Sequence, residues 1–158
     1  MSKAASHIPA GFHTATPYLI VNDGARAIEF YKQAFNADVI NCDATADGQF
    51  LNAEIRIGTS PLMIGQHQEI LPKEEALPLV SLYLYVEDAT ALAAQAVAAG
   101  ATEIMPVTNK FYGNREGGVR DPFGITWWIA THIEDLTPEE IAERAAAFFS
   151  GASEASAT

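Results

Sequence analysis

The sequence is poor in cysteine, in basic residues and in long apolar runs. Cys42 is the only cysteine among 158 residues, so no disulfide forms within one chain, and we expect it to be a small core residue. Nine lysines and arginines stand against twenty aspartates and glutamates, which gives a net charge of −11. Such a surface repels nucleic-acid phosphates and anionic lipid, so we expect neither nucleic acid nor a membrane as a partner.

No stretch approaches the roughly 18 consecutive apolar residues of a membrane-spanning helix, and residues 1–12 contain no apolar signal segment. We therefore expect a cytoplasmic protein. Hydrophobic residues make up 49% of the chain and charged residues 18%, which is typical of a globular protein. A chain of this length fits one compact domain, or two small units that share a core.

The first part of the chain carries the signals of a strand, a helix and three further strands. Residues 14–21 predict a strand, and Asp23 is a good N-cap for a helix over about 24–35. Asn36 is suited to end that helix in a left-handed conformation. Turn signals then separate three predicted strands, over 37–43, 50–57 and 61–65.

The same order of elements returns in the second part of the chain. Val21-Asn22-Asp23 reappears 65 positions later as Val86-Glu87-Asp88, between a predicted strand over 79–86 and an alanine-rich helix that Gly100 ends. Further strands are predicted at about 101–107, 115–120 and 125–132. One such unit alone leaves a sheet face uncovered, so two units in one chain are expected to pack together.

These signals divide the chain into six segments, each with its own expected structure. Thr137-Pro138-Glu139-Glu140 predicts the start of the last helix, whose apolar stripe of Ile141, Ala145, Phe148 and Phe149 must dock on another surface. The expected segments are a flexible leader over 1–12, a first module over 13–66, a linker over 67–78, a second module over 79–133, a C-terminal helix over 137–150, and a disordered tail over 151–158.

Several segments resemble the PhnB-like branch of the vicinal oxygen chelate superfamily, which includes glyoxalases, bleomycin resistance proteins and dioxygenases. The resemblance is carried by ATPYLIVNDGARAIEFYKQAF (15–35), LNAEIRIGTSPLMIG (51–65), VSLYLYVEDATAL (80–92) and FYGNREGGVRDPFGITWWIATHIEDLTPEEI (111–141). It implies an α+β fold in which two βαβββ modules form a cupped, eight-stranded mixed sheet. It also implies a homodimer with a ligand site inside the cup.

Alternation along each strand separates a face that packs on a helix from a face that lines the cup. The expected helix-side residues are Ala15, Leu19, Val21, Leu51, Ala53, Ile55, Ile57, Val80, Leu82, Leu84, Val86, Ile125, Trp127 and Ile129. The expected ligand-binding residues on the other side are Thr16, Tyr18, Asn52, Arg56, Ser81, Tyr83, Tyr85, Arg120 and Trp128, with Glu54 as a candidate catalytic base. Aromatic surface with a few polar groups suits a small-molecule pocket, although a solvated sheet face carries a similar mixture.

The superfamily resemblance implies four metal-ligand positions, which in this chain fall on Thr16, Ser81, Trp128 and, near the linker, Met63. These side chains are not the imidazole, carboxylate or thiolate ligands that Zn²⁺, Ni²⁺ or Fe²⁺ requires. The four histidines show no metal-binding spacing. We therefore expect no metal cofactor, and a divalent metal held by His13 or His132 remains the alternative.

The sequence leaves three functions open. The first is a metal-free protein that binds a small, partly aromatic organic molecule in the cup. The second is a lyase, isomerase or dioxygenase-type enzyme, either metal-dependent or using Glu54 as general base with Arg56 or Arg120 stabilising an oxyanion. The third is an interaction module that exploits its dimer and binds no ligand.

Overall fold

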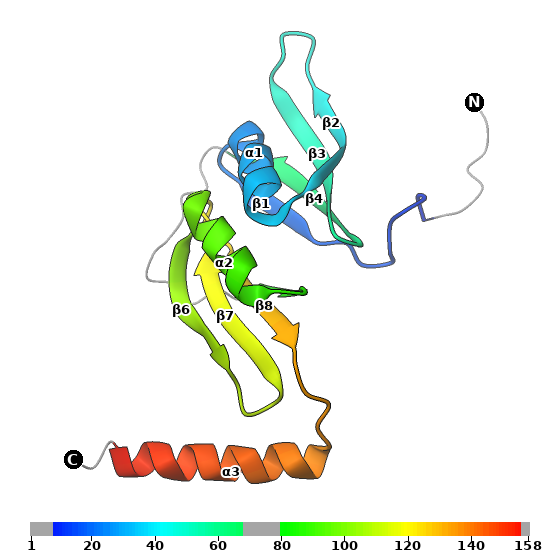
Figure 1. Ribbon diagram of the computed structural model, residues 1–158. Coiled ribbons are helices and arrows are strands. Elements are labelled where there is room, and N and C mark those ends of the chain that lie inside the picture. Colours follow the sequence, from blue (N-terminus) through cyan, green and yellow to red (C-terminus); the bar gives the residue numbers. More distant parts are fainter. Residues whose placement is uncertain (1–7, 68–79, 156–158) are drawn as a thin grey trace. The chain divides into compact units, whose positions relative to one another are not determined.

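The computed structural model describes residues 8–67 and 80–155, and the chain divides into two compact units, Met1–Ala76 and Leu77–Thr158 (Figure 1). Apart from His67, the predicted linker lies outside the described residues, as do residues 1–7 of the predicted leader. Within the described ranges, every helix is too short or too polar to cross a membrane.

The first unit is a four-stranded mixed sheet with one helix. Along the chain its elements are β1 (Tyr18–Val21), α1 (Gly24–Phe35), β2 (Asp38–Ala44), β3 (Phe50–Ile57) and β4 (Ser60–Gln66). The strand order is β1-β4-β3-β2, with β1 parallel to β4 and the other neighbours antiparallel. Helix α1 packs on β3 and β4, so one face of this sheet is covered.

Helix α1 begins and ends where its capping residues predict. The Asp23 carboxylate accepts the backbone N–H of Arg26 at 3.0 Å, and Asn36 adopts a left-handed conformation with φ of 54°. Tyr31 and Ala34 are fully buried between these ends. The predicted helix over 24–35 is confirmed.

The second unit repeats this plan and adds a terminal helix. Its elements are β5 (Leu82–Tyr85), α2 (Ala89–Ala98), β6 (Thr102–Asn109), β7 (Asn114–Arg120), β8 (Thr126–His132) and α3 (Pro138–Ala155). The strand order is β5-β8-β7-β6, and β5 is parallel to β8. Helix α2 packs on β6, β7 and β8. Two βαβββ modules of an α+β fold, followed by a C-terminal helix, are therefore confirmed.

The repeat extends to single hydrogen bonds. In the first unit, the Gln66 side-chain oxygen at the end of β4 accepts the N–H of Gly24 at the start of α1, at 2.8 Å. In the second unit, the Thr131 hydroxyl near the end of β8 accepts the N–H of Ala89 at the start of α2, also at 2.8 Å. Each module therefore ties its helix N-terminus to its last strand, which satisfies a backbone donor that the helix itself cannot.

A buried aspartate shapes the turn between β7 and β8. Asp121 is 4% exposed, and its Oδ1 accepts the N–H groups of Phe123 and Ile125, both at 2.9 Å. Its Oδ2 accepts the indole N–H of the fully buried Trp127 at 2.9 Å. This carboxylate fixes the turn and attaches it to the core, so it sets how β7 and β8 meet.

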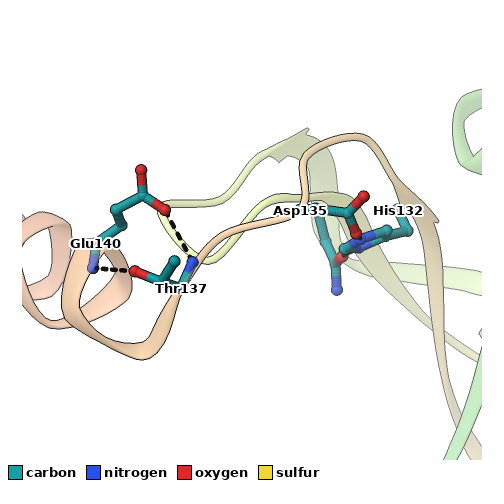
Figure 2. A network of polar contacts seen from close by, with 5 residues as sticks. His132, Asp135, Thr137 and Glu140 are labelled. Carbon is teal, nitrogen blue, oxygen red and sulfur yellow. Dashed lines mark hydrogen bonds and ion pairs between the residues drawn. The ribbon is translucent and has the colours of Figure 1, made fainter.

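Helix α3 starts with a capping box (Figure 2). Glu140 N–H donates to the Thr137 hydroxyl at 3.2 Å, and Thr137 N–H donates to the Glu140 carboxylate at 2.8 Å, as the sequence predicts. The helix continues to Ala155, so the prediction of a disordered tail from residue 151 is wrong for 151–155. Residues 156–158 lie outside the described part.

The apolar stripe of α3 is only partly docked. Phe148 and Phe149 lie 5.3 Å and 6.0 Å from the ring of Phe111, centroid to centroid, yet they remain 58% and 63% exposed.

Five sequence-based expectations are wrong at strand ends and edges. Strand β1 starts at Tyr18 rather than at 14, because the chain before Pro17 forms bends, and Ala15 is exposed instead of facing a helix. Val80 is 76% exposed because β5 starts only at Leu82. Leu51 is 55% exposed near the end of β3. Cys42 is also exposed, because the whole of the edge strand β2 is open to solvent.

Candidate ligand-binding site

Polar and aromatic side chains gather on the face of the second sheet that α2 does not cover. Residues Trp127 and Ile129 of β8 are fully buried, and Trp128, between them, points to the opposite face. The Trp128 indole N–H donates to the Ser81 hydroxyl at 3.2 Å. Tyr83 pairs with Trp128 in the register of β5 and β8, and the rings of Tyr83 and Tyr85 lie 5.0 Å apart. The structure thus brings four of the predicted ligand-binding residues together.

Behind these rings lies a buried carboxylate that the sequence analysis missed. Glu116 of β7 is 5% exposed and accepts a hydrogen bond from the Tyr83 hydroxyl. The Tyr112 hydroxyl is close enough to Glu116 to feel its charge. Burial, and then the neighbouring Glu116 carboxylate, raise the pKa of Tyr112 to about 12 and raise the pKa of Tyr83 as well. Both tyrosines therefore stay protonated at neutral pH, and Tyr83 donates to the carboxylate.

The hydrogen bonds continue from Tyr83 toward the start of α3. Asn114 is 6% exposed, and its side-chain N–H donates to the Tyr83 hydroxyl at 3.2 Å. Its oxygen lies 3.0 Å from Nδ1 of His132, so the His132 ring donates through Nδ1. Nε2 of His132 lies 2.9 Å from the Asp135 carboxylate, and the two side chains are drawn in Figure 2. Asn114 is thus held from both sides, which fixes the orientation of the Tyr83 hydroxyl.

Strand alternation contained the signal for this carboxylate. Asn114, Glu116 and Arg120 share one face of β7, with Gly118 between the last two. The strand predicted over 115–120 includes Glu116 and starts one residue after β7 does. The backbone positions of the two charged residues on this face, Glu116 and Arg120, are about 13 Å apart at the usual rise of a strand.

Gly118 leaves the space in which Trp128 lies. A Cβ atom at Gly118 would be 2.6 Å from the six-membered part of the Trp128 indole, far closer than such atoms approach. Gly118 and Trp128 are also register partners across β7 and β8. The small residue on one strand therefore lets the large aromatic side chain on the next lie flat on this face.

The equivalent face of the first unit carries three of the predicted residues. Tyr18 and Glu54 both pair with Met63 in the strand register, and Asn52 pairs with Gly65. The Tyr18 ring extends over Gly65, where a Cβ atom would lie 2.4 Å from the tyrosine hydroxyl. The Asn52 side-chain oxygen is buried and has no hydrogen-bond partner, so it is an unused acceptor on this face.

Other predicted site residues are engaged elsewhere or stand apart. Thr16 precedes β1, and its hydroxyl donates to the exposed backbone oxygen of His13 at 3.4 Å. Arg56 forms an ion pair with Asp38 at 3.7 Å, with both side chains largely exposed, rather than with Glu54. Among the described residues, no hydrogen bond or ion pair joins Glu54 to another side chain.

The four positions at which the fold family would hold a metal do not suit a divalent ion. Trp128 offers an indole N–H, which is a donor and is directed at Ser81. Thr16 and Met63, in the first unit, supply a hydroxyl and a thioether, which are poor ligands for Zn²⁺ or Fe²⁺. Across residues 8–67 and 80–155, no group of three or more His, Cys, Asp or Glu side chains could hold a metal ion.

A separate groove lies on the opposite side of the second sheet, between α2 and β6. It has a volume of about 450 Å³ and is lined by Thr90, Ala93, Ala94, Val97, Ala98, Glu103 and Val107. Glu103 is its only carboxylate. This groove and the aromatic face are thus chemically distinct.

The sequence and the fold of the chain are similar to those of known proteins. A model of the Glyoxalase/Bleomycin resistance protein/Dioxygenase superfamily matches residues 11–129. An uncharacterized protein of Mycobacterium bovis is 30% identical over 133 residues, which cover 80% of this chain and 88% of that protein. The crystal structure of TioX from Micromonospora sp. ML1 matches with a TM-score of 0.60 and 22% identity, over 79% of this chain and 100% of TioX. A PhnB protein from Bacillus cereus matches with a TM-score of 0.57 and 15% identity, over 75% of this chain and 99% of that one. The chain therefore belongs to the glyoxalase/bleomycin resistance protein/dioxygenase superfamily.

Proposed function

We propose that this protein binds a small, partly aromatic organic molecule on the face formed by Ser81, Tyr83, Tyr85, Glu116 and Trp128, without a metal ion. The observation that carries the proposal is the exposure of aromatic surface around a buried carboxylate. Tyr83 and Tyr85 are 41% and 67% exposed. Exposed aromatic surface beside fixed hydrogen-bonding groups is typical of small-molecule sites.

The chemistry of this face suits binding of a flat ligand. Tyrosine and tryptophan rings present large apolar areas with little side-chain freedom to lose, and aromatic pairs add about 0.5–1.5 kcal/mol beyond the buried area. The hydrogen bonds of Tyr83 with Glu116 and Asn114 hold its ring in place before a ligand arrives. A site that is ordered in advance loses less entropy on binding.

The equivalent face of the first module carries Tyr18 and the unused acceptor of Asn52, which we also propose as ligand-binding groups. We also propose that the chain belongs to the PhnB-like branch, that it forms a homodimer and that it acts in the cytoplasm. We propose binding without a metal because Thr16, Ser81 and Trp128 offer no strong ligand for a divalent ion.

Binding can be tested with naphthalene-type aromatic compounds by isothermal titration calorimetry, followed by product analysis of the recovered compound. We expect saturable binding with the compound recovered unchanged. Tyr85→Ala should weaken binding about tenfold, which corresponds to the loss of one aromatic contact. Phe149→Ala is the matched control, because Phe149 is an aromatic residue of similar exposure, 63%, on α3.

Two results contradict the proposal. Equal weakening by Tyr85→Ala and Phe149→Ala would place binding outside this face. Conversion of the compound during incubation would instead indicate an enzyme, and loss of that conversion in Glu54→Gln would identify Glu54 as its base.

A further inference from the structure

We infer that the ligand carries a positive charge, such as a protonated amine or amidine next to its aromatic part, and that Glu116 is the residue that recognises it. The inference rests on the proposed binding function and specifies the ligand class of that site. Three observations support it. Glu116 is hydrogen-bonded to the aromatic face, the described basic side chains of the second unit have other partners or stand apart from it, and the first module has a neutral residue at the equivalent position.

Glu116 acts on the aromatic face through the tyrosine that contacts it. The Tyr83 hydroxyl donates a hydrogen bond to its carboxylate, and donation to an anion increases the electron density of a phenol ring. A cation is attracted to the negative face of an aromatic ring, and most strongly to tryptophan and tyrosine. Because Tyr83 is 41% exposed, a ligand cation can lie on its ring while the buried charge attracts it from behind.

No described basic side chain of the second unit forms an ion pair with this carboxylate. Arg115 donates to Thr90 and Asn109, and Lys110 donates to Thr108. Arg144 pairs with Glu134 at 2.5 Å, and the backbone of Arg120 lies about 13 Å along β7 from that of Glu116 by strand geometry. The charge of Glu116 is therefore stabilised by neutral donors, and the net charge of −11 draws cations toward the protein.

The first module shows that the fold does not require a carboxylate at this position. Glu116 pairs with Ala130 of β8, and the residue in the equivalent register of the first module is Asn52, which pairs with Gly65 of β4. A neutral amide thus occupies this place in the same fold. A buried charge is costly unless it interacts with donors or a counter-ion, so a carboxylate here indicates a specific electrostatic role.

The test compares three probes that share a ring system and differ in charge. They are 2-(aminomethyl)naphthalene, which is an ammonium ion at neutral pH, 2-naphthalenemethanol and 2-naphthoate. Binding to the full chain is measured by calorimetry at fixed ionic strength. We expect the ammonium to bind about tenfold more tightly than the alcohol, and naphthoate to bind most weakly.

Three variants locate the source of this preference. Glu116→Gln keeps an acceptor for the Tyr83 hydroxyl and removes the charge, so the ratio of the two affinities should fall toward one. Glu103→Gln removes one charge from the opposite side of the same sheet and should leave the ratio unchanged. Glu116→Asp keeps the charge and should retain most of the preference, and it serves as the decisive variant if the glutamine variant fails to fold.

The results distinguish a failure of the cation preference from a failure of the proposed binding function. If none of the probes binds, the proposed binding function fails, and the inference fails with it. If the alcohol or naphthoate binds as tightly as the ammonium, the binding function stands and the inference is overturned. An equal loss of preference in Glu103→Gln would assign the effect to overall charge and would also overturn the role of Glu116.

Discussion

The Asp121 carboxylate allows a sharp test of how the second sheet is held together. It is 4% exposed and accepts two backbone N–H groups and the Trp127 indole N–H, all at 2.9 Å. Each buried donor left without an acceptor costs about 1–3 kcal/mol. Asp121→Ala abandons three donors at once, and allowing for some entry of water we expect it to lower the free energy of unfolding by about 4 kcal/mol.

The isosteric change is more informative because it affects one hydrogen bond. Asp121→Asn keeps Oδ1 for the backbone of Phe123 and Ile125 but directs an amide N–H₂ at the indole N–H of Trp127. Two donors then face each other, and we expect a loss of about 2 kcal/mol. In a Trp127→Phe background the opposing donor is absent, so the same change should cost at least about 1 kcal/mol less.

Urea unfolding followed by far-UV circular dichroism gives the four free energies of this double-mutant cycle. Asp38→Asn is the matched control, because Asp38 is exposed and its ion pair with Arg56 is 3.7 Å long. It should cost less than about 0.5 kcal/mol. The reasoning is refuted if Asp121→Asn costs no more than this control, or if its cost is the same with and without Trp127.

Three further predictions concern the aromatic face and the last helix. The pKa of Tyr112 is about 12, above its ordinary value of 10, so its contribution to stability is complete below pH 10 and is lost as the pH rises toward 12. Tyr112→Phe should therefore flatten the fall of the unfolding free energy between pH 10 and 12 in urea titrations. Gly118→Ala should displace the Trp128 ring, because the new Cβ would lie 2.6 Å from it. We expect shifted tryptophan emission and weaker binding of aromatic probes, with an unchanged far-UV circular dichroism spectrum. Thr137→Ala removes the N-cap of α3 and should destabilise that helix by about 1 kcal/mol. Amide hydrogen exchange in its first turn should become faster. The control Thr108→Ala, on β6, should leave that exchange unchanged.

Local signals account for the parts of the fold that the sequence predicts well. Asp23 and Asn36 bound α1 because capping depends on residues next to each other in the chain. The capping box at Thr137 is local in the same way. Strand ends are predicted less well, because whether a residue joins a strand depends on the partner strand rather than on its neighbours in sequence. Val80 was expected in this strand but lies outside β5.

The candidate site was predicted only in part, for a related reason. Alternation identified Tyr83, Tyr85 and Trp128 correctly as one face of the second sheet. The same rule, applied to the predicted strand over 115–120, places Glu116 on that face as well, but its burial depends on Tyr83, which approaches it from another strand. Arg56 was expected to act with Glu54, yet Asp38 on the neighbouring strand is its ion-pair partner.

The two modules differ most where packing does not constrain them. In both modules a side chain on the last strand accepts a backbone N–H at the start of the helix, Gln66 in the first and Thr131 in the second. Without this contact, that N–H would have no hydrogen-bond partner within the helix. On the uncovered face, by contrast, Met63 and Trp128 are both partners of a tyrosine in the strand register but differ in chemistry. A side chain on this face adds little to the packing of its own helix, so its identity is free to follow a ligand. The exposed tyrosines, Trp128 and the buried Glu116 carboxylate lie on the second module. Ligand affinity should therefore be more sensitive to changes on its face than to those at Tyr18 or Asn52.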